Sequence, residues 1–181
     1  MSGARDGPLV ICVTGAECTG KTTLAEHLAQ ALDVPLVPEV ARRFLVGRTG
    51  YEKEDVLAIA RAQQAAERSA LERAGLVVAD TDLTVIQVWW EEKYGALHPW
   101  ILRALVERTP RRYLLAKPDL PWEFDPLRES PHDRPRLHER YRVLLQASAF
   151  PYHEVTGLGD ERVNGALTQV QRWIASHPPR R

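Results

Sequence analysis

Short apolar runs alternate along the chain with longer segments in which apolar residues recur at helical spacing. The run Leu9–Thr14 is rich in β-branched residues, and further strand-like runs follow near residues 36–37, 76–79, 112–116 and 152–156. Continuous apolar runs of this length are typical of parallel strands that are covered on both faces. The pattern therefore predicts a five-stranded sheet whose parallel strands are joined by crossover helices.

Helix formers fill the segments between these runs. Leu24, Leu28 and Leu32 share one stripe of the first segment, Gly75 is a natural stop for another, and Pro99 can open a helical turn. The expected helices cover residues 21–32, 39–46, 53–74, 83–94, 99–108, 136–148 and 160–176. Together these elements predict an α/β fold in a single domain over residues 1–176, followed by a flexible tail at 177–181.

Residues 117–135 interrupt this pattern. Each proline removes a hydrogen-bond donor and clashes with the preceding turn, so a regular helix is excluded there. Long irregular segments inside a compact domain are usually functional or disordered. We expect this segment to be a mobile lid. Its prolines are Pro118, Pro121, Pro126, Pro131 and Pro135.

The charge balance and the cysteine count narrow the class of protein. The chain of 181 residues carries 24 basic and 24 acidic side chains, so it lacks the basic excess that neutralises nucleic-acid phosphates. No apolar run approaches the roughly 18 residues of a membrane-spanning helix, and Cys12 and Cys18 supply neither a disulfide framework nor a zinc site. We expect a cytoplasmic protein that acts on a small molecule, without a nucleic-acid or membrane partner. The sequence leaves the oligomeric state open.

The strongest motif is the stretch G-A-E-C-T-G-K-T at residues 15–22, which matches the phosphate-loop pattern G-x-x-x-x-G-K-[ST] in full. In this pattern backbone N–H groups turn inward around a phosphate, and the following helix adds its positive N-terminal end. Lys21 reaches the β- and γ-phosphates, and the Thr22 hydroxyl binds Mg²⁺. A chance match in an ordinary strand–turn–helix is the alternative. The nucleotide-binding residues expected here are Gly15, Ala16, Glu17, Cys18, Thr19, Gly20, Lys21, Thr22 and Thr23.

Two further segments bear on the class of phosphate-loop protein. The stretch A-K-P-D at 116–119 imitates the guanine-reading motif N-K-x-D of GTPases but lacks its asparagine. The stretch D-T-D-L at 80–83 lacks the glycine of D-x-x-G and the Asp-Glu pair of multi-subunit ATPases. The sequence therefore favours a kinase over a GTPase or a motor. A module that senses adenine nucleotide or NAD without turnover remains an alternative.

Three carboxylates follow strands at the sheet edge where the phosphate loop lies. Asp80 and Asp82 end the third strand, and two carboxylates at this spacing can divide the work. One binds the Mg²⁺ shell with Thr22, and the other orients or deprotonates an acceptor hydroxyl. Glu39 follows the second strand, so we expect it to face the γ-phosphate across a cleft. The alternatives are a helix cap for Asp82 and a first-turn helix acid for Glu39.

Arginines in and after the proline-rich segment supply the opposite charge. A guanidinium delivered by a closing lid stabilises the charge of a transferring phosphoryl group. Arg128 is favoured because it follows Trp122, whose indole can anchor the lid or stack on a flat substrate ring. A solvated surface is the alternative for each of these arginines. The other candidates are Arg134, Arg136 and Arg140.

Several stretches together resemble the ribosylnicotinamide kinase domain of NadR-type proteins and its stand-alone relatives. The phosphate loop is generic, whereas the combination of Pro-Glu-x-x-Arg, Asp-Thr-Asp and Asp-Leu-Pro-Trp with a following arginine is much narrower. The stretches that carry the resemblance are T-G-A-E-C-T-G-K-T-T-L at 14–24, V-P-E-V-A-R-R-F-L at 37–45, V-V-A-D-T-D-L at 77–83, K-Y-G at 93–95, H-P at 98–99, P-D-L-P-W-E-F-D-P-L-R at 118–128 and D-R at 133–134.

This resemblance implies a three-layer P-loop fold like that of nucleoside kinases, with sheet order 2-3-1-4-5 and a lid. It implies transfer of the γ-phosphate of ATP, with Mg²⁺, to the 5′-hydroxyl of nicotinamide riboside, giving nicotinamide mononucleotide for NAD salvage. It places adenine near Gly157 and Arg162. A kinase for another nucleoside or a vitamin-like alcohol is the alternative. The catalytic and substrate-binding residues implied, together with Lys21, are Glu39, Arg42, Asp80, Asp82, Trp122 and Arg128.

The sequence departs from the family pattern at two positions. Cys18 stands where a serine is common, and it is either a small filler or an oxidation-sensitive thiol. Val40 replaces an aromatic residue that often follows the strand-two glutamate, so either another ring stacks on nicotinamide or a different substrate binds. Tyr51 can line the acceptor cleft instead. Aromatic residues also cluster around one helix junction, where they can hold a pyridinium cation or pack the core: Trp89, Trp90, Tyr94 and Trp100.

Overall fold

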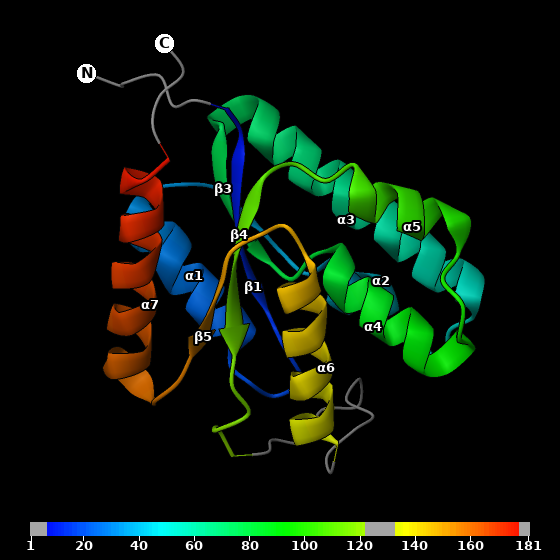
Figure 1. Ribbon diagram of the computed structural model, residues 1–181. Coiled ribbons are helices and arrows are strands. Elements are labelled where there is room, and N and C mark those ends of the chain that lie inside the picture. Colours follow the sequence, from blue (N-terminus) through cyan, green and yellow to red (C-terminus); the bar gives the residue numbers. More distant parts are fainter. Residues whose placement is uncertain (1–6, 122–132, 178–181) are drawn as a thin grey trace.

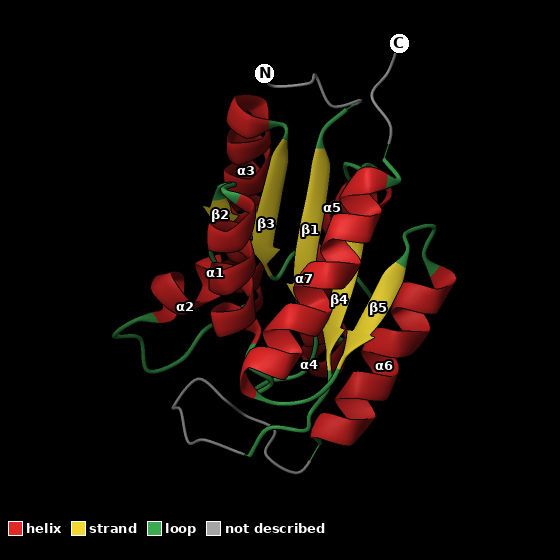
Figure 2. Ribbon diagram, turned by 90° about the vertical axis from the view of Figure 1, so that its left-hand side faces the viewer, coloured by secondary structure: helices red, strands yellow, loops and turns green. Residues whose placement is uncertain are grey.

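Five parallel strands form the middle layer of the protein in the order β2-β3-β1-β4-β5. The structure is a computed structural model that describes residues 7–121 and 133–177. All neighbouring strands pair in parallel, as the arrows of β3, β4 and β5 show (Figure 2), which brings the carboxyl ends of the strands to one edge of the sheet. The sheet order predicted from the sequence is confirmed. The strands are β1 (Leu9–Thr14), β2 (Leu36–Val37), β3 (Leu76–Asp80), β4 (Arg111–Ala116) and β5 (Tyr152–Val155).

Helices cover both faces of this sheet. Figure 1 shows α1 and α7 on one side and α3, α4, α5 and α6 on the other. Crossover connections between parallel strands place helices on both faces of the sheet. Because both faces are then buried, the strand residues on each face are apolar. The helices are α1 (Lys21–Leu32), α2 (Val40–Leu45), α3 (Lys53–Ala74), α4 (Leu83–Tyr94), α5 (Pro99–Val106), α6 (Arg134–Ala147) and α7 (Gly159–Ala175).

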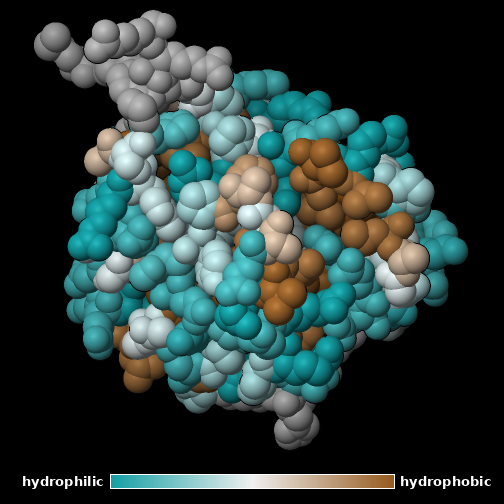
Figure 3. Space-filling view, in the orientation of Figure 1, coloured by the Kyte–Doolittle hydropathy of each residue, from teal (hydrophilic) through white to brown (hydrophobic). Residues whose placement is uncertain are grey.

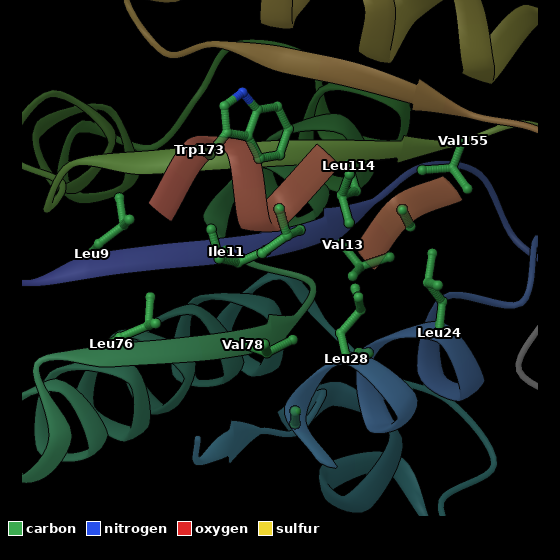
Figure 4. Packing of buried hydrophobic residues seen from close by; sticks show 14 residues of the cluster. Leu9, Ile11, Val13, Leu24, Leu28, Leu76, Val78, Leu114, Val155 and Trp173 are labelled. Carbon is green, nitrogen blue, oxygen red and sulfur yellow. The ribbon is translucent and has the colours of Figure 1, made fainter. Parts of the chain in front are cut away.

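Successive residues of a strand belong to two different parts of the core, one on each face of the sheet. Ile11 and Val13 of β1 point toward α1 and α7, where they pack with Leu28 and Trp173 (Figure 4). The intervening residues of β1, Val10 and Cys12, join the opposite cluster with α3, α4 and α6. Since successive side chains of a strand point to opposite faces, a run that is apolar throughout serves both layers at once.

Small differences from the sequence-based expectation lie at the ends of elements. The third strand continues to Asp80, which pairs with Val13 of β1. Helix α6 begins at Arg134, earlier than expected, because Pro135 in the first helical turn removes an N–H group that has no partner there in any case. The irregular segment therefore ends before residue 134. Most of the predicted lid and most of the predicted tail lie outside the described residues.

The surface is mostly hydrophilic on the face drawn in Figure 3, with a few hydrophobic patches. The helices within residues 7–121 and 133–177 are each too short or too polar to cross a bilayer. Apolar side chains are common on the surfaces of globular proteins. The large exposed ones among the described residues are Val46, Leu102, Val106, Val143 and Leu158.

Candidate active site

The phosphate loop connects the end of β1 to the start of α1, and its backbone adopts conformations that most residues avoid. Gly15 has φ 134°, Cys18 has φ 54° and Gly20 has φ 70°. A Cβ atom on Gly15 would lie 2.8 Å from the carbonyl oxygen of Ala116, so only glycine fits against β4. Lys21 extends back over the loop, and its Nζ donates to the Ala16 carbonyl at 2.7 Å. The predicted loop residues therefore form one curved segment around the N-terminus of α1.

Two arginines bind the outer carbonyl groups of this loop. Arg134, at the start of α6, donates to Cys18 O at 3.2 Å and to Leu120 O at 2.8 Å. Arg162 of α7 donates to Thr19 O at 2.9 Å. Because the N–H and C=O groups of a peptide point in opposite directions, carbonyls that are held outward favour N–H groups that point inward.

Thr22 and Asp80 connect the phosphate loop to the end of β3. The Thr22 hydroxyl donates to Asp80 Oδ2 at 2.7 Å, while the buried Asp80 Oδ1 has no hydrogen-bond partner among the described residues. Burial raises the pKa of the Asp80 carboxyl, although the Thr22 hydrogen bond and the charge of Lys21 oppose this rise. A buried carboxylate oxygen without a donor, beside a hydroxyl, suits a small hard cation such as Mg²⁺.

Glu39 is the N-cap residue of α2 and lines the same cleft as the phosphate loop. Burial raises the pKa of its carboxyl, Asp80 raises it further, and Lys21 opposes the rise. The charge of Arg42, whose Nε lies 3.8 Å from Glu39 Oε2, also opposes it. A carboxylate with a raised pKa is a better proton acceptor than an exposed one, so this placement fits the predicted base.

Asp82 does not lie beside Asp80 at the cleft. Thr81, between them, has a left-handed backbone with φ 68°, which turns the chain so that the two carboxylates leave the strand in different directions. Asp82 Oδ2 accepts hydrogen bonds from Arg111 Nη1 and the Tyr113 hydroxyl, both at 2.7 Å. The side chain is 1% exposed. This geometry contradicts the prediction that Asp82 contacts substrate or acts as the base.

Asp82 instead belongs to a buried network of charges. Its Oδ1 accepts the Thr84 backbone N–H at 2.8 Å and caps α4, as the alternative reading of the sequence allowed. Glu67 of α3 binds the other side of the Arg111 guanidinium at 2.8 Å. Burial opposes the charged form of Asp82, but Arg111 and Arg108 outweigh it and lower the pKa of this carboxyl. The network fastens α3 and α4 to the sheet.

Arg162 differs from its predicted role as a direct nucleotide contact, whereas the role of Gly157 beside adenine stays a prediction. The Arg162 side chain is 5% exposed, and its Nη1 donates to Asp119 Oδ1 at 2.8 Å and to Gly157 O at 3.1 Å. The Gly157 N–H donates to Asp119 Oδ2 at 3.0 Å. These polar groups are therefore bound to other parts of the protein, which gives Arg162 a positioning role between loops.

A cleft of about 1030 Å³ extends from the phosphate loop to the opposite wall formed by α2 and α4. Sequence reasoning missed part of this wall: Arg48, Glu92 and Lys93 line it together with the predicted Arg42. On α4, Val85, Trp89 and Glu92 share one face at helical spacing, and this periodicity was the available signal. A second hollow of about 830 Å³, near Pro35 and Arg111, contains none of the predicted site residues that the structure describes.

The structure separates the aromatic residues that the sequence singled out, Tyr51 and the helix-junction cluster, into two groups. Tyr51 and Trp89 line the cleft. Their ring centroids lie 4.8 Å apart, and Trp89 Nε1 donates to the Tyr51 hydroxyl at 2.8 Å. Lys93 Nζ lies 3.8 Å from the Tyr51 ring centroid. Trp90 is buried in the core with Tyr94 at its edge, as the packing alternative predicted.

The other predicted arginines make different contacts in the structure. Arg136 binds Glu92 in two contacts, the shorter at 2.7 Å. Arg140 binds Glu91 at 2.5 Å, so these two side chains tie α6 to α4. Trp122 and Arg128 lie outside the described residues, and their roles stay predictions.

Comparison with solved structures supports the fold. The chain aligns with the NadR protein in complex with NR at a TM-score of 0.78 and 21% sequence identity, over 96% of this chain and 53% of that chain. NadR in complex with NAD and AMP-PNP gives a TM-score of 0.75 and 20% identity, over 97% and 52% of the two chains. The protein thus spans about half the length of these NadR chains.

Shorter kinases align over nearly their whole length. Thymidylate kinase from Ehrlichia chaffeensis has a TM-score of 0.67 and 17% identity, over 93% of this chain and 99% of that chain. Identities this low establish the fold alone, and this fold is the predicted three-layer P-loop architecture. A search of curated proteins finds no match. A family model described as AAA domain matches residues 10–162, and the chain therefore belongs to this AAA_28 family of P-loop domains.

Proposed function

We propose that this protein is an ATP-dependent kinase that phosphorylates the 5′-hydroxyl of nicotinamide riboside. The observation that carries the proposal is that the phosphate loop and Glu39 line one cleft, with Asp80 bound to Thr22 of that loop. Phosphoryl transfer requires a triphosphate site, a cation site and a proton acceptor within reach of one another. The similarity to NadR in complex with NR supports the choice of acceptor.

The donor triphosphate binds in the phosphate loop with Mg²⁺. Backbone N–H groups of the phosphate loop and the Lys21 ammonium neutralise its charge. Thr22 and Asp80 are the residues that would hold Mg²⁺, and Asp80 Oδ1, which has no hydrogen-bond partner within residues 7–121 and 133–177, fits this role. When bound, Mg²⁺ neutralises charge that develops on the phosphate oxygens during transfer.

The acceptor hydroxyl approaches from the Glu39 side of the cleft. As its oxygen forms a bond to the γ-phosphorus, the bond from that phosphorus to the β,γ-bridging oxygen breaks, and ADP leaves. The hydroxyl proton passes to the Glu39 carboxylate, whose buried position makes it more basic than an exposed glutamate. Lys21 stays close to the transferring group and stabilises its charge.

The acceptor ring has an aromatic surface available on the far wall. The rings of Tyr51 and Trp89 pack edge to face on that wall. Flat heteroaromatic rings bind to such aromatic surfaces by stacking. A pyridinium ring gains additional attraction from the electron-rich faces of the aromatic side chains. The Tyr51–Trp89 pair therefore supplies the aromatic surface that an aromatic residue at the position of Val40 supplies in the family pattern.

A coupled ADP-release assay with a panel of nucleosides tests the proposal. We expect release that depends on nicotinamide riboside, and a loss of this release in Lys21→Ala but not in the matched control Lys53→Ala, since Lys53 is exposed at the start of α3. Release with a different nucleoside only would reassign the acceptor. Tight nucleotide binding without release for any alcohol would contradict a kinase and favour a sensing module.

A further inference from the structure

The segment 116–119, which imitates a guanine-reading motif, lies at the carboxyl end of β4 beside the phosphate loop. Glu39 and Asp80 occupy the β2 and β3 side of that loop, which is the acceptor side in the proposed function. The nucleoside of the donor must then extend the other way, toward the loops after β4 and β5. Asp119 and Gly157 belong to these two loops. The inference that follows rests on the proposed function only in this choice of sides.

A carboxylate at the donor side can recognise guanine, because guanine offers two adjacent N–H donors, N1–H and the 2-amino group. Bidentate pairing uses both carboxylate oxygens at once. Adenine presents an acceptor nitrogen at the equivalent edge and gains nothing from a carboxylate there. The availability of Asp119 therefore bears directly on the choice between the two bases.

Both oxygens of Asp119 are bound within the protein. Oδ1 accepts from Arg162 Nη1 at 2.8 Å, and Oδ2 accepts from the Gly157 N–H at 3.0 Å. Arg162 is itself held by the carbonyls of Thr19 at 2.9 Å and Lys117 at 3.3 Å. A guanidinium with partners on separate loops cannot turn away from Asp119 without breaking several hydrogen bonds.

Lys117 and Ala116 of the segment are also held in place. Lys117 pairs with Glu154 of β5 at 3.1 Å. Ala116 is fully buried, and its carbonyl oxygen lies where a Cβ atom on Gly15 would come within 2.8 Å. Ala116, Lys117 and Asp119 thus connect the phosphate loop, β5 and the loop that follows β5.

We propose that Arg162 determines nucleotide choice by holding the Asp119 carboxylate, so that the donor site does not select guanine. Removing Arg162 frees Oδ1 of the Asp119 carboxylate beside the base, while Oδ2 still accepts from the Gly157 N–H. The freed oxygen attracts an N–H donor of guanine and repels the N1 lone pair of adenine. Loss of the contact with Thr19 weakens the phosphate loop for both nucleotides equally, so the ratio of the two affinities isolates the effect on the base.

Titration of the full chain with ATP and with GTP, without an acceptor, tests this assignment. We expect Arg162→Met to shift the ratio of the two dissociation constants about tenfold toward GTP, the effect of one charge-assisted hydrogen bond. Asp119→Asn alone should leave the wild-type ratio within twofold, and the double variant Arg162→Met/Asp119→Asn should lose the shift. Equal weakening of both nucleotides in Arg162→Met, or a shift that persists in the double variant, would overturn the proposal.

A second measurement requires no variant and decides the matter if Arg162→Met does not fold. Inosine triphosphate lacks the 2-amino group of GTP, so the wild-type protein should bind the two within twofold of each other. Clearly tighter binding of GTP would show that Asp119 already reads guanine and would overturn the proposal. Because these titrations need no phosphoryl transfer, failure of the kinase reaction leaves their outcome intact. Absence of binding by any of these nucleotides would overturn both proposals.

Discussion

The Thr22 hydroxyl lies 2.7 Å from Asp80 Oδ2 and joins the first turn of α1 to the end of β3. The neighbouring Asp80 Oδ1 is buried without a partner among the described residues. We predict that Asp80→Asn removes the benefit of Mg²⁺ in ATP binding, because an amide replaces the anionic ligand. Titration of ATP with and without Mg²⁺ measures this benefit. An unchanged Mg²⁺ effect in the variant would place the cation elsewhere.

Glu39→Gln should lower turnover by a factor of about 10² to 10⁴ while leaving the affinity for ATP nearly unchanged, because it removes a proton acceptor and keeps the shape. Single-turnover rates and ATP titrations separate the two effects. The exposed Glu72→Gln on α3 is the matched control.

The same substitution should stabilise the fold at neutral pH. Burial raises the pKa of Glu39 in the folded state, so folding disfavours its charged form, and a neutral glutamine avoids that cost. The difference in unfolding free energy between variant and wild type should shrink as the pH falls and the wild-type carboxyl becomes protonated. A Glu39→Gln protein that is less stable than wild type at pH 7 would contradict this account of the site.

Arg42→Met should move the acid limb of the pH–rate profile to higher pH. Burial already raises the pKa of Glu39, and the charge of Arg42 opposes that rise, so its removal raises the pKa further. The base is then protonated, and inactive, at a higher pH than in wild type. The profile of kcat/KM for the acceptor reports this limb. A shift in the opposite direction would exclude Glu39 as the base.

Asp82→Asn should destabilise the protein by about 3–5 kcal/mol, the usual effect of breaking a buried ion pair. The pKa of Asp82 is lowered in the folded state, so its stabilising contribution is complete above the pKa of the unfolded chain. It is lost as the pH falls through the folded value. Denaturant unfolding at pH 7 and at acid pH measures the difference. A stable variant without turnover would restore Asp82 to the reaction.

Trp89→Ala should raise the KM for the acceptor about tenfold, which is typical for the loss of one stacking ring, with the KM for ATP unchanged. Trp100→Ala is the control, because Trp100 packs beside Arg61 and does not line the cleft. Steady-state kinetics with each substrate varied in turn give both constants. Equal effects of the two substitutions would argue against a ring-binding role for Trp89.

The strands, the helices and the phosphate loop were predictable because each is encoded in local spacing. Asp82 was not. Asp80 and Asp82 were expected to divide the work of one site, which requires that they lie on the same side, as residues two apart do in an extended strand. The left-handed turn at Thr81 breaks that alternation, and threonine carries no signal for it. The internal hydrogen bonds of Arg162 could not be predicted either, because its partners at Thr19, Lys117 and Asp119 are distant in the sequence.

The reaction product gives the most direct test of phosphoryl transfer in this cleft. Wild-type protein is incubated with ATP, Mg²⁺ and nicotinamide riboside, and the nucleotides are separated and identified by mass. The account predicts nicotinamide mononucleotide and ADP in equal amounts, with neither formed above background by Lys21→Ala. ADP that accumulates without a phosphorylated riboside, or no turnover under conditions where ATP binds, would contradict it.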